Sequence, residues 1–597
     1  MFKFETNTSL IILASVLFAS LPVLYVLSDW ERKHRATKFL NRKLNLSLVC
    51  MPLRTLDELV NFYKNPVPWK TLVKPLTPRT GPIKFKPFTD AENDGDEEKF
   101  SENRREILVC HDFKGNYRED SYISEASKWD GYRFYNWYGI DIFCYFSHDL
   151  VSVPTLQYIN AAHKHGVAVL GTFIAEFAPG RLIMEKVLES REKVEQIADS
   201  LVLVAKYCGF EGWLMNIECP IEKEKVPLLV EFLEYLTARV RLEIPNGRVI
   251  WYDSVTIDGN LLWQNQVNSK NLIFFEKSDG IFLNYNWSDQ QMQRTLSEVE
   301  RFNRFKDVFV GIDVFGRGQV AKLQSHKTFQ RIPEQFSVAL FATGWTLESI
   351  EVEMKHARQP MFTQELNSRF LARDRLFWGQ LWPMLTIYGP NQLPFYTSFC
   401  IGSGEFSNRL GMRVKRKPWF DLRKQEIQPC NPELERCFED SFDGGSCLSF
   451  EKTFIGKIER LFVCDLGYVK NLLVSVAFKR NYRTIDLNLI LKLKKSPFDK
   501  ETCWFLVEKN YAGDMEKVNK ASDDDDVRSA IDNLQNRGVR HLPFVNSING
   551  WEVRHHLLRL YRGHTLNDIG IKIIGSQEIP EDAQLLLGAL SIHEVDL

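Results

Sequence analysis

Short apolar segments recur at regular intervals through the middle of this 597-residue chain, and stretches with helical periodicity separate them. Eight strands alternating with connecting segments over roughly 240 residues match the size and pattern of a TIM-type (β/α)8 barrel, an α/β fold. A doubly wound open sheet is the alternative that this alternation allows. The eight segments are ILVCH (107–111), IDIFCYF (140–146), VAVLGTF (167–173), GWLMNIE (212–218), VIWYD (249–253), GIFLNY (280–285), VFVGIDV (308–314) and SVALF (337–341).

The ends of these segments favour the barrel. Nearly every segment finishes in polar or aromatic residues, and barrel enzymes build their sites at the C-terminal ends of the strands. The residues concerned are His111 and Asp112, Ser147 and His148, Glu176, Asn216 and Glu218, Tyr252 and Asp253, Asn284 to Trp287, Asp313 and Trp345. Such endings on almost all of the strands predict a site at one end of a barrel, although His111 and Asp112 could serve only to brace the first strand.

The most informative ending is that of GWLMNIE, where Asn216 and Glu218 stand two positions apart. In a strand, alternate side chains share a face, so both would point the same way, together with Leu214. A carboxylic acid beside a carboxamide suits acid–base chemistry on a group that also has to be oriented. Taken alone, the motif also allows a simpler interpretation, a strand that runs out into a polar loop.

The chain is too long for one ordinary domain. After about residue 346 the barrel rhythm stops, and alternating patterns such as LLVSVAF, IDLNLILKL and HLLRLY predict a β-sandwich. We therefore divide the chain into an N-terminal hydrophobic segment (1–28), a linker leading into the barrel (29–104), the barrel (105–345), a barrel-closing and connecting region (346–430) and the β-sandwich (431–597).

Charge and cysteine content exclude several classes of protein. With 76 basic and 77 acidic residues, the chain has no overall field that favours nucleic acid. Its 11 cysteines include no CxxC pair and no Cys/His cluster at zinc spacing, so we expect reduced thiols, no metal and no cofactor. Cys430, Cys437 and Cys447 could form a bridge only in a secreted protein. The acidic run from Asp523 to Asp526 predicts a solvated loop, with a calcium site as the alternative.

The N-terminus carries a segment that could cross a membrane. Residues 10–27 are almost wholly apolar, and a bilayer takes roughly 20 such residues. A cleaved signal peptide, ending near residue 28, is the alternative. Only Lys3 precedes the segment, whereas six basic residues follow it: Arg32, Lys33, Arg35, Lys38, Arg42 and Lys43. This bias predicts that the body of the protein lies in the cytosol, tethered through residues 10–27 if the segment is retained.

Glycosylation sequons agree with a cytosolic location. Asn7, Asn45 and Asn286 each begin an Asn-x-Ser/Thr triplet. Asn286 lies at a predicted strand end, where a glycan would block the site. We therefore expect the body of the protein to stay outside the secretory pathway.

Nine stretches of the chain resemble the cytosolic endo-β-N-acetylglucosaminidases of glycoside hydrolase family 85. They follow the family's order over about residues 80–410 and are highly specific: LVCHDFKGNY (108–117), FYNWYGIDIFCYFSH (134–148), HGVAVLGTFIAE (165–176), GFEGWLMNIE (209–218), WYDSVT (251–256), NYNW (284–287), VGIDVFGRG (310–318), FSVALFATGW (336–345) and PFYTSFCIGSG (394–404). The later SFDGGSCLSF (441–450) looks like the opening of the family's carbohydrate-binding-like sandwich. The N-terminal apolar segment departs from the family.

The resemblance implies hydrolysis of the β-1,4 bond between the two N-acetylglucosamines at the base of an N-glycan. Most retaining glycosidases use two carboxylates, whereas this strand offers one carboxylate and one amide. The substrate's own 2-acetamido oxygen would then be the nucleophile. Glu218 would be the acid and base, and Asn216 would orient the acetamido group, at the position where related substrate-assisted chitinases carry an aspartate. Tyr252 would donate to the acetamido oxygen or to the oxazoline intermediate.

The resemblance also implies substrate contacts. Trp263 and Trp287 match aromatic residues that stack on sugars, although either could be a core residue. Glu176, Asn284 and Trp345 are further candidates. The expected partners are N-glycans or N-glycoproteins, in glycan catabolism and with transglycosylation as a side activity. A non-catalytic glycan-binding barrel is the competing hypothesis; a family 18-type chitinase is disfavoured because the acidic DxDxE strand is missing.

Overall fold

The structure, a computed structural model, describes residues 49–67, 69–80, 83–84, 104–317, 322–358, 362–495, 502–510, 517–575 and 578–596. The chain divides into two compact units, Met1–Val49 and Cys50–Leu597. All that follows concerns the second unit. None of the helices in the described ranges is long and apolar enough to cross a membrane. The predicted membrane segment 10–27 and the sequons at Asn7 and Asn45 lie outside the described residues.

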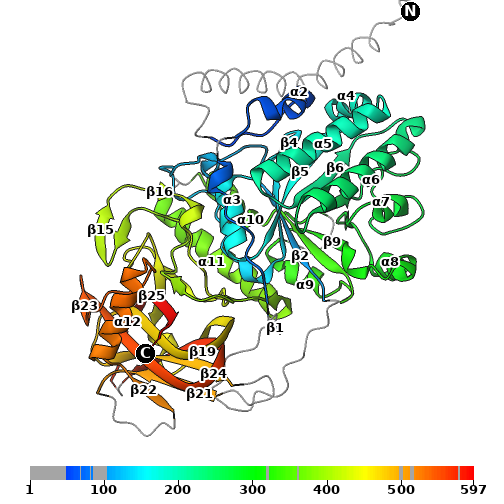
Figure 1. The fold of residues 1–597 in the computed structure, drawn as a ribbon. Helices are drawn as coiled ribbons and strands as arrows, with labels where there is room; N and C mark the ends of the chain where they lie inside the picture. Colours follow the sequence, from blue (N-terminus) through cyan, green and yellow to red (C-terminus); the bar gives the residue numbers. More distant parts are fainter. Residues whose placement is uncertain are drawn as a thin grey trace, which may run out of the picture. The chain divides into compact units, whose positions relative to one another are not determined.

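Eight parallel strands close into a barrel, as predicted (Figure 1). Each strand pairs in parallel with its neighbours, and closure follows because β10 pairs with β2 while β3 pairs with β5. This closure excludes the open doubly wound sheet. The strands are β2 (Ile107–Asp112), β3 (Ile142–Phe146), β5 (Ala168–Glu176), β6 (Gly212–Glu218), β7 (Arg248–Tyr252), β8 (Gly280–Leu283), β9 (Val308–Asp313) and β10 (Ser337–Phe341). A short β4 (Val151–Ser152) adds an antiparallel partner to β5.

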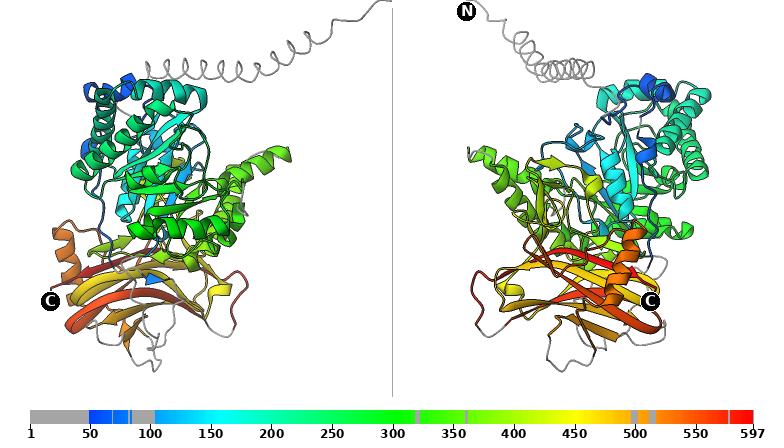
Figure 2. Two further views of the ribbon diagram at one scale, coloured as in Figure 1. Left: turned by 90° about the vertical axis from the view of Figure 1, so that its right-hand side faces the viewer. Right: turned by 60° about the vertical axis from the view of Figure 1, so that its left-hand side comes forward.

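Helices surround the barrel on its outer side (Figures 1 and 2). The helices before and within the barrel are α2 (Leu56–Val60), α3 (Leu156–Lys164), α4 (Phe177–Val187), α5 (Arg191–Cys208), α6 (Val226–Glu243), α7 (Leu272–Glu276), α8 (Asp289–Val299) and α9 (Ser325–Phe329). The helices that follow β10 are α10 (Trp345–His356) and α11 (Thr363–Leu381). Between β2 and β3 the chain forms only two 3-10 turns, η4 (Glu119–Ser121) and η5 (Trp137–Gly139), so this crossover departs from the regular alternation.

A glycine fixes the start of β6, the strand that carries the predicted catalytic pair. Gly212 has a φ of 141°, and a Cβ at this position would lie 1.9 Å from the carbonyl oxygen of Arg248 on the neighbouring strand. Only glycine allows this close approach. From there the side chains alternate as predicted, with Trp213, Met215 and Ile217 in the outer core and Leu214, Asn216 and Glu218 at the pocket inside the barrel.

The C-terminal part of the unit is a ten-stranded mixed sheet, which confirms the predicted β region. Two long strands, β19 with 23 residues and β24 with 25 residues, hold it together as one hydrogen-bonded sheet. Register shifts between Arg460 and Asn471 bend β19 in its middle. Its strands are β12 (Phe395–Thr397), β17 (Glu435–Cys437), β18 (Cys447–Glu451), β19 (Ile458–Arg480), β20 (Ile485–Lys494), β21 (Thr502–Val507), β22 (Val518–Lys520), β23 (Ser547–Ile548), β24 (Trp551–Gly575) and β25 (Gln584–Glu594).

Three two-stranded sheets complete the unit. They pair β1 (Ile83–Lys84) with β11 (Thr386–Ile387), β13 (Ser403–Gly404) with β16 (Trp419–Phe420), and β14 (Ser407–Arg409) with β15 (Met412–Lys415). All three draw strands from the region predicted to connect barrel and sandwich. That region also supplies β12, which pairs with β25 of the large sheet. The predicted connecting region therefore pairs through β11 with β1, which precedes the barrel, and through β12 with the large sheet.

The acidic run is not the solvated loop that the sequence predicted. Asp524 accepts a hydrogen bond from the backbone N–H of Val527 and caps α12 (Asp525–Asn536). Asp525 and Asp526 lie in the first turn, where carboxylates complement the positive end of the helix. The run therefore starts a helix, and α12 packs its apolar side on β19 and β24.

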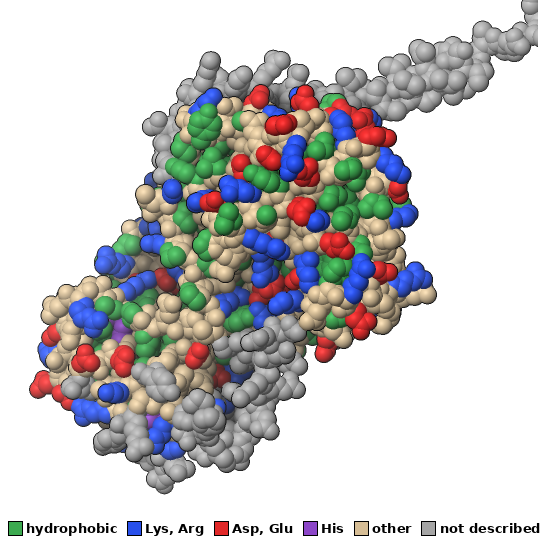
Figure 3. All heavy atoms as spheres, turned by 45° about the vertical axis from the view of Figure 1, so that its right-hand side comes forward, with side chains coloured by type: hydrophobic (Ala, Val, Ile, Leu, Met, Phe, Trp, Pro, Cys, Tyr) green, Lys and Arg blue, Asp and Glu red, His purple; other side chains and the backbone are tan. Residues whose placement is uncertain are grey.

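All eleven cysteines are buried and in the thiol form. Cys437 and Cys447 are direct neighbours on the antiparallel strands β17 and β18 but are not linked by a disulfide. Charges of both signs are interspersed over the face of the molecule drawn in Figure 3, in keeping with the balanced composition.

Candidate active site

A pocket of about 250 Å³ lies at the C-terminal ends of the barrel strands. Seven strand-end or loop residues supply its polar lining: His148, Glu176, Asn216, Glu218, Tyr252, Tyr285 and Arg317. Aromatic and aliphatic side chains form the rest: Phe146, Phe177, Leu214, Phe282, Phe341 and Cys110. The pocket therefore joins a few polar groups to an apolar wall, as small-ligand sites do.

Glu218 lies between an indole and an amide. Its Oε1 accepts a hydrogen bond from Trp263 Nε1 at 3.0 Å, and its Oε2 accepts one from Asn216 Nδ2 at 3.5 Å. Burial, and after it the charge of Glu176, raises the pKa of Glu218, although the two hydrogen bonds act in the opposite direction. The raised pKa favours the protonated carboxyl group that a general acid requires.

A row of polar groups extends from Asn216 across the strand ends. Asn216 Nδ2 donates to Glu176 Oε1 at 3.0 Å, Glu176 Oε2 lies 3.3 Å from His148 Nδ1, and His148 Nε2 lies 3.4 Å from Asp112 Oδ1. Burial would lower the pKa of His148, but the hydrogen bonds to Asp112 and Glu176 outweigh burial and raise it to about 10. His148 is therefore a cation between two carboxylates.

The hydroxyl of Tyr252 is held by an asparagine that does not line the pocket. Its hydroxyl donates to Asn284 Oδ1 at 2.9 Å, and Asn284 Nδ2 donates to Asn265 Oδ1 at 3.1 Å. Burial and the nearby Glu218 raise the pKa of Tyr252 well above its usual value, so the phenol stays protonated. The structure thus brings Tyr252 to the pocket with Glu218 and puts Asn284 behind it.

The three predicted tryptophans occupy different environments. Trp263 is 37% exposed beside Glu218. Trp287 is 2% exposed and donates through Nε1 to the carbonyl of Gly311, so it takes the core position that the sequence left open. Trp345 begins α10 and packs 4.9 Å from the ring of Phe315. None of the three is among the described residues that line the pocket, and Trp263 reaches it only through the hydrogen bond to Glu218.

Three polar pocket residues, His148, Tyr285 and Arg317, received no individual role from the sequence. His148 was visible only as one of several polar strand ends. Arg317 follows β9 and donates through Nε to the buried Asp313 at 2.7 Å, while 66% of its side chain stays exposed. The sequence signals for Arg317 were its place after a strand end and within the family-like stretch VGIDVFGRG, and neither indicates an ion pair.

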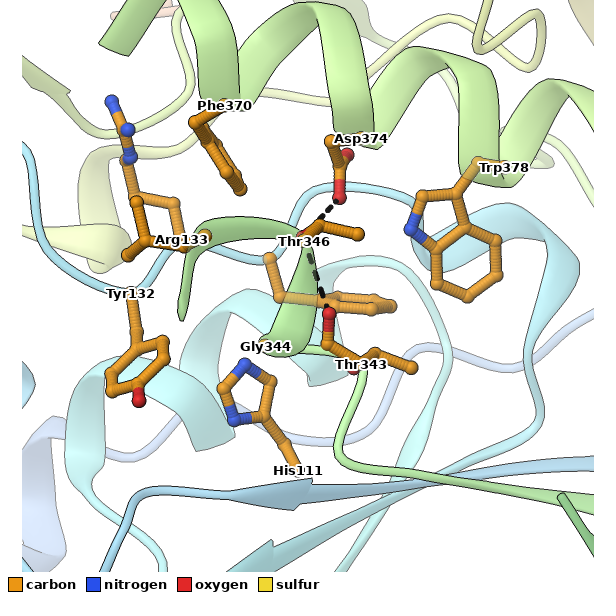
Figure 4. A pocket seen from close by; sticks show the side chains of 11 residues that line it. His111, Tyr132, Arg133, Thr343, Gly344, Thr346, Phe370, Asp374 and Trp378 are labelled. Atoms are coloured by element: carbon orange, nitrogen blue, oxygen red, sulfur yellow. Dashed lines mark hydrogen bonds between the residues drawn. The ribbon is translucent and has the colours of Figure 1, made fainter. Parts of the chain in front are cut away.

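A second cavity, near the start of α10, is far smaller (Figure 4). It encloses about 10 Å³, room for one water molecule, between His111, Tyr132 and α11. Thr346 donates there to Asp374 at 3.2 Å. Burial lowers the pKa of His111 to about 4, and its ring packs on Phe113 and Tyr132. His111 therefore braces the first strand and takes no part in the pocket.

Among the residues that the structure describes, no group of three or more His, Cys, Asp or Glu side chains is arranged to hold a metal ion.

The comparisons with known proteins agree with this geometry. Residues 115–407 match the model of Glycosyl hydrolase family 85. The chain is 36% identical over 413 residues to the cytosolic endo-beta-N-acetylglucosaminidase of Homo sapiens, covering 66% of this chain and 53% of that protein. It is 35% identical over 446 residues to the enzyme of the same name from Danio rerio, covering 72% and 58%. The chain thus spans less than two thirds of the length of these relatives.

A solved structure shares the fold. The glycoside hydrolase domain of Endo-D from Streptococcus pneumoniae R6 superposes with a TM-score of 0.66 at 18% identity, covering 92% of this chain and 83% of that chain. At this identity the likeness concerns the fold alone.

Proposed function

The barrel of this chain belongs to glycosyl hydrolase family 85, and on that premise we propose that the protein is an endo-β-N-acetylglucosaminidase. It cleaves the β-1,4 bond between the two N-acetylglucosamines of an N-glycan core and leaves one of them on the protein or released sugar. The observation that carries the proposal is the pairing of Glu218 with the amide of Asn216 at one strand end, in a pocket of sugar size.

The first half of the reaction uses both side chains of this pair. Glu218, whose pKa burial raises, protonates the oxygen of the departing N-acetylglucosamine. Asn216 accepts the acetamido N–H through Oδ1 and holds the acetamido oxygen for attack on the anomeric carbon. With substrate bound, the Tyr252 hydroxyl turns away from Asn284 Oδ1 and donates its one hydrogen bond to the acetamido oxygen as charge develops.

The second half returns the proton. Glu218, now ionised, deprotonates a water molecule that opens the oxazolinium ion, and the anomeric configuration is retained. A sugar hydroxyl in place of water gives transglycosylation. The exposed ring of Trp263 is the stacking surface that we assign to the substrate at the mouth of the pocket.

One assay tests the proposal. The protein is incubated with free oligosaccharides that end in one or in two N-acetylglucosamines, and release of a single residue is expected only from the second. Glu218→Gln keeps the shape of the side chain but removes its proton, so turnover should fall by about 10²–10⁴-fold. A non-catalytic glycan-binding barrel would bind both sugars and release nothing.

We also place the enzyme in the cytosol, with a membrane tether through residues 10–27. The basic residues that follow this segment and the sequon at Asn286, close to the pocket after β8, support this topology. In intact cells, residues beyond 30 should be protected from added protease, and Asn45 and Asn286 should carry no glycan. A mobility shift that a glycosidase reverses would contradict the topology.

A further inference from the structure

The amide of Asn216 lies between two carboxylates. Its Nδ2 donates to Glu176 Oε1 at 3.0 Å and to Glu218 Oε2 at 3.5 Å. Ionised carboxylates only accept hydrogen bonds, so Nδ2 has to face them and Oδ1 has to point elsewhere. Glu176 makes the shorter of the two contacts. Glu176, rather than Glu218, therefore determines which way the amide of Asn216 is turned.

Glu176 is itself held on its other oxygen. Its Oε2 lies 3.3 Å from His148 Nδ1, and Asp112 holds the opposite ring nitrogen of His148 at 3.4 Å. The backbone of His148 has a φ of 58°, a left-handed conformation that non-glycine residues adopt only where their surroundings enforce it. The histidine is thus fixed beside Glu176, between that side chain and Asp112.

We propose that Glu176 is a positioning residue that acts through Asn216, turning Oδ1 toward the substrate's acetamido N–H and strengthening it as an acceptor. The inference rests on the proposed function, and it gives Glu176 a different task from the direct substrate contact expected from the sequence. His148 and Asp112 complete the row by keeping Glu176 in place.

The chemistry explains why an amide needs this help. As the acetamido oxygen attacks, positive charge builds up on the acetamido nitrogen, and its N–H requires a strong acceptor. A neutral amide oxygen is a weak one. A carboxylate that accepts from the far end of the same amide polarises it and shifts electron density to Oδ1. Glu176 and Asn216 together then replace a carboxylate at position 216, with the charge carried by Glu176.

A nucleophilic role for Glu176 is the competing assignment, because retaining glycosidases with two carboxylates exist. Both oxygens of Glu176 are engaged, one by Asn216 and one by His148. Glu176→Ala in the presence of sodium azide distinguishes the two. An inverted glycosyl azide would identify a nucleophile and overturn the proposal, whereas we expect no inverted azide.

A double-mutant cycle tests the coupling. We compare kcat/KM on a free oligosaccharide with two terminal N-acetylglucosamines, at a pH low enough that Glu218 is protonated in every variant. Glu176→Gln should lower kcat/KM by about 10²-fold, the cost of a misplaced reacting group. In the Asn216→Ala background the same change should have no further effect. If instead the fold-losses in kcat/KM of the two single variants multiply in the double variant, Glu176 acts independently of Asn216.

An exchange of the two functional groups gives a second readout. Asn216→Asp alone puts a third carboxylate beside Glu176 and Glu218, so it should be poorly active. Adding Glu176→Gln restores one amide and one carboxylate, with the hydrogen bond reversed, and should raise kcat/KM above that of Asn216→Asp. A double variant no more active than Asn216→Asp would contradict the proposal.

Glu211→Gln is the matched control. Glu211 forms another buried pair with a histidine, 3.1 Å from His163 Nε2, but it lies before β6 at the other end of the barrel. It should change the melting temperature without changing kcat/KM of the folded enzyme. If the wild-type chain cleaves neither oligosaccharide, the proposed function fails. If it cleaves the oligosaccharide that ends in two N-acetylglucosamines and the fold-losses of the double-mutant cycle multiply, only the inference about Glu176 fails.

Discussion

At the scale of single residues, the pH dependence of the site depends on the surroundings of Glu218. Burial and the charge of Glu176 raise its pKa, and the hydrogen bonds from Trp263 and Asn216 lower it. The first step needs the protonated acid. Activity should therefore be present below the raised pKa and should be lost as the pH rises through it.

Two substitutions should move this basic limb of kcat/KM in opposite directions. Glu176→Gln removes a negative charge, so the limb should shift to lower pH. Trp263→Phe removes a hydrogen bond that stabilises the ionised form, so the limb should shift to higher pH. Full pH profiles of both variants check this, with Glu211→Gln as the unshifted reference. A common shift in one direction would mean that Glu218 is not the group that titrates.

At the scale of secondary-structure elements, the sequence predicts the barrel strands well because each is a continuous apolar run. β6 and β10 have the predicted bounds, and the alternation in β6 follows from its period of two. The sequence failed where local chemistry decided the outcome. The run from Asp523 to Asp526 starts a helix because carboxylates cap helix N-termini, a signal that a loop assignment ignores.

The sequence was sufficient to predict the residues at the centre of the site but not the surroundings of the tryptophans. Asn216, Glu218 and Tyr252 sit at strand ends, whose direction the barrel determines. Trp263 and Trp287 could not be separated by sequence, because burial depends on the length of the following loop. Residues 253–271 form a long loop that carries Trp263 to the pocket, whereas Trp287 stands directly before the cap of α8 and packs inward.

At the scale of the whole molecule, the barrel and the β region share buried contacts. Gln425 is fully buried; its Oε1 accepts from Trp137 Nε1 at 2.5 Å, and its Nε2 donates to the carbonyls of Phe134 and Ile401 at 3.0 and 3.2 Å. An apolar core cluster also contains residues of both parts. Gln425 thus ties the barrel to the connecting region, a few residues before the boundary predicted at residue 431.

Unfolding of the whole molecule tests the contribution of the buried hydrogen bonds of Gln425. Gln425→Ala leaves the Trp137 indole and two backbone carbonyls without that partner, so it should lower the free energy of unfolding by about 3 kcal/mol. Residues 50–597 form one compact unit, so one urea transition should shift as a whole when fluorescence and circular dichroism are followed together. Gln535→Ala, at an exposed position in α12, should change stability by no more than about 0.5 kcal/mol. Two separate transitions, with only one displaced by Gln425→Ala, would show that barrel and sheet unfold independently and that this side chain stabilises one of them alone.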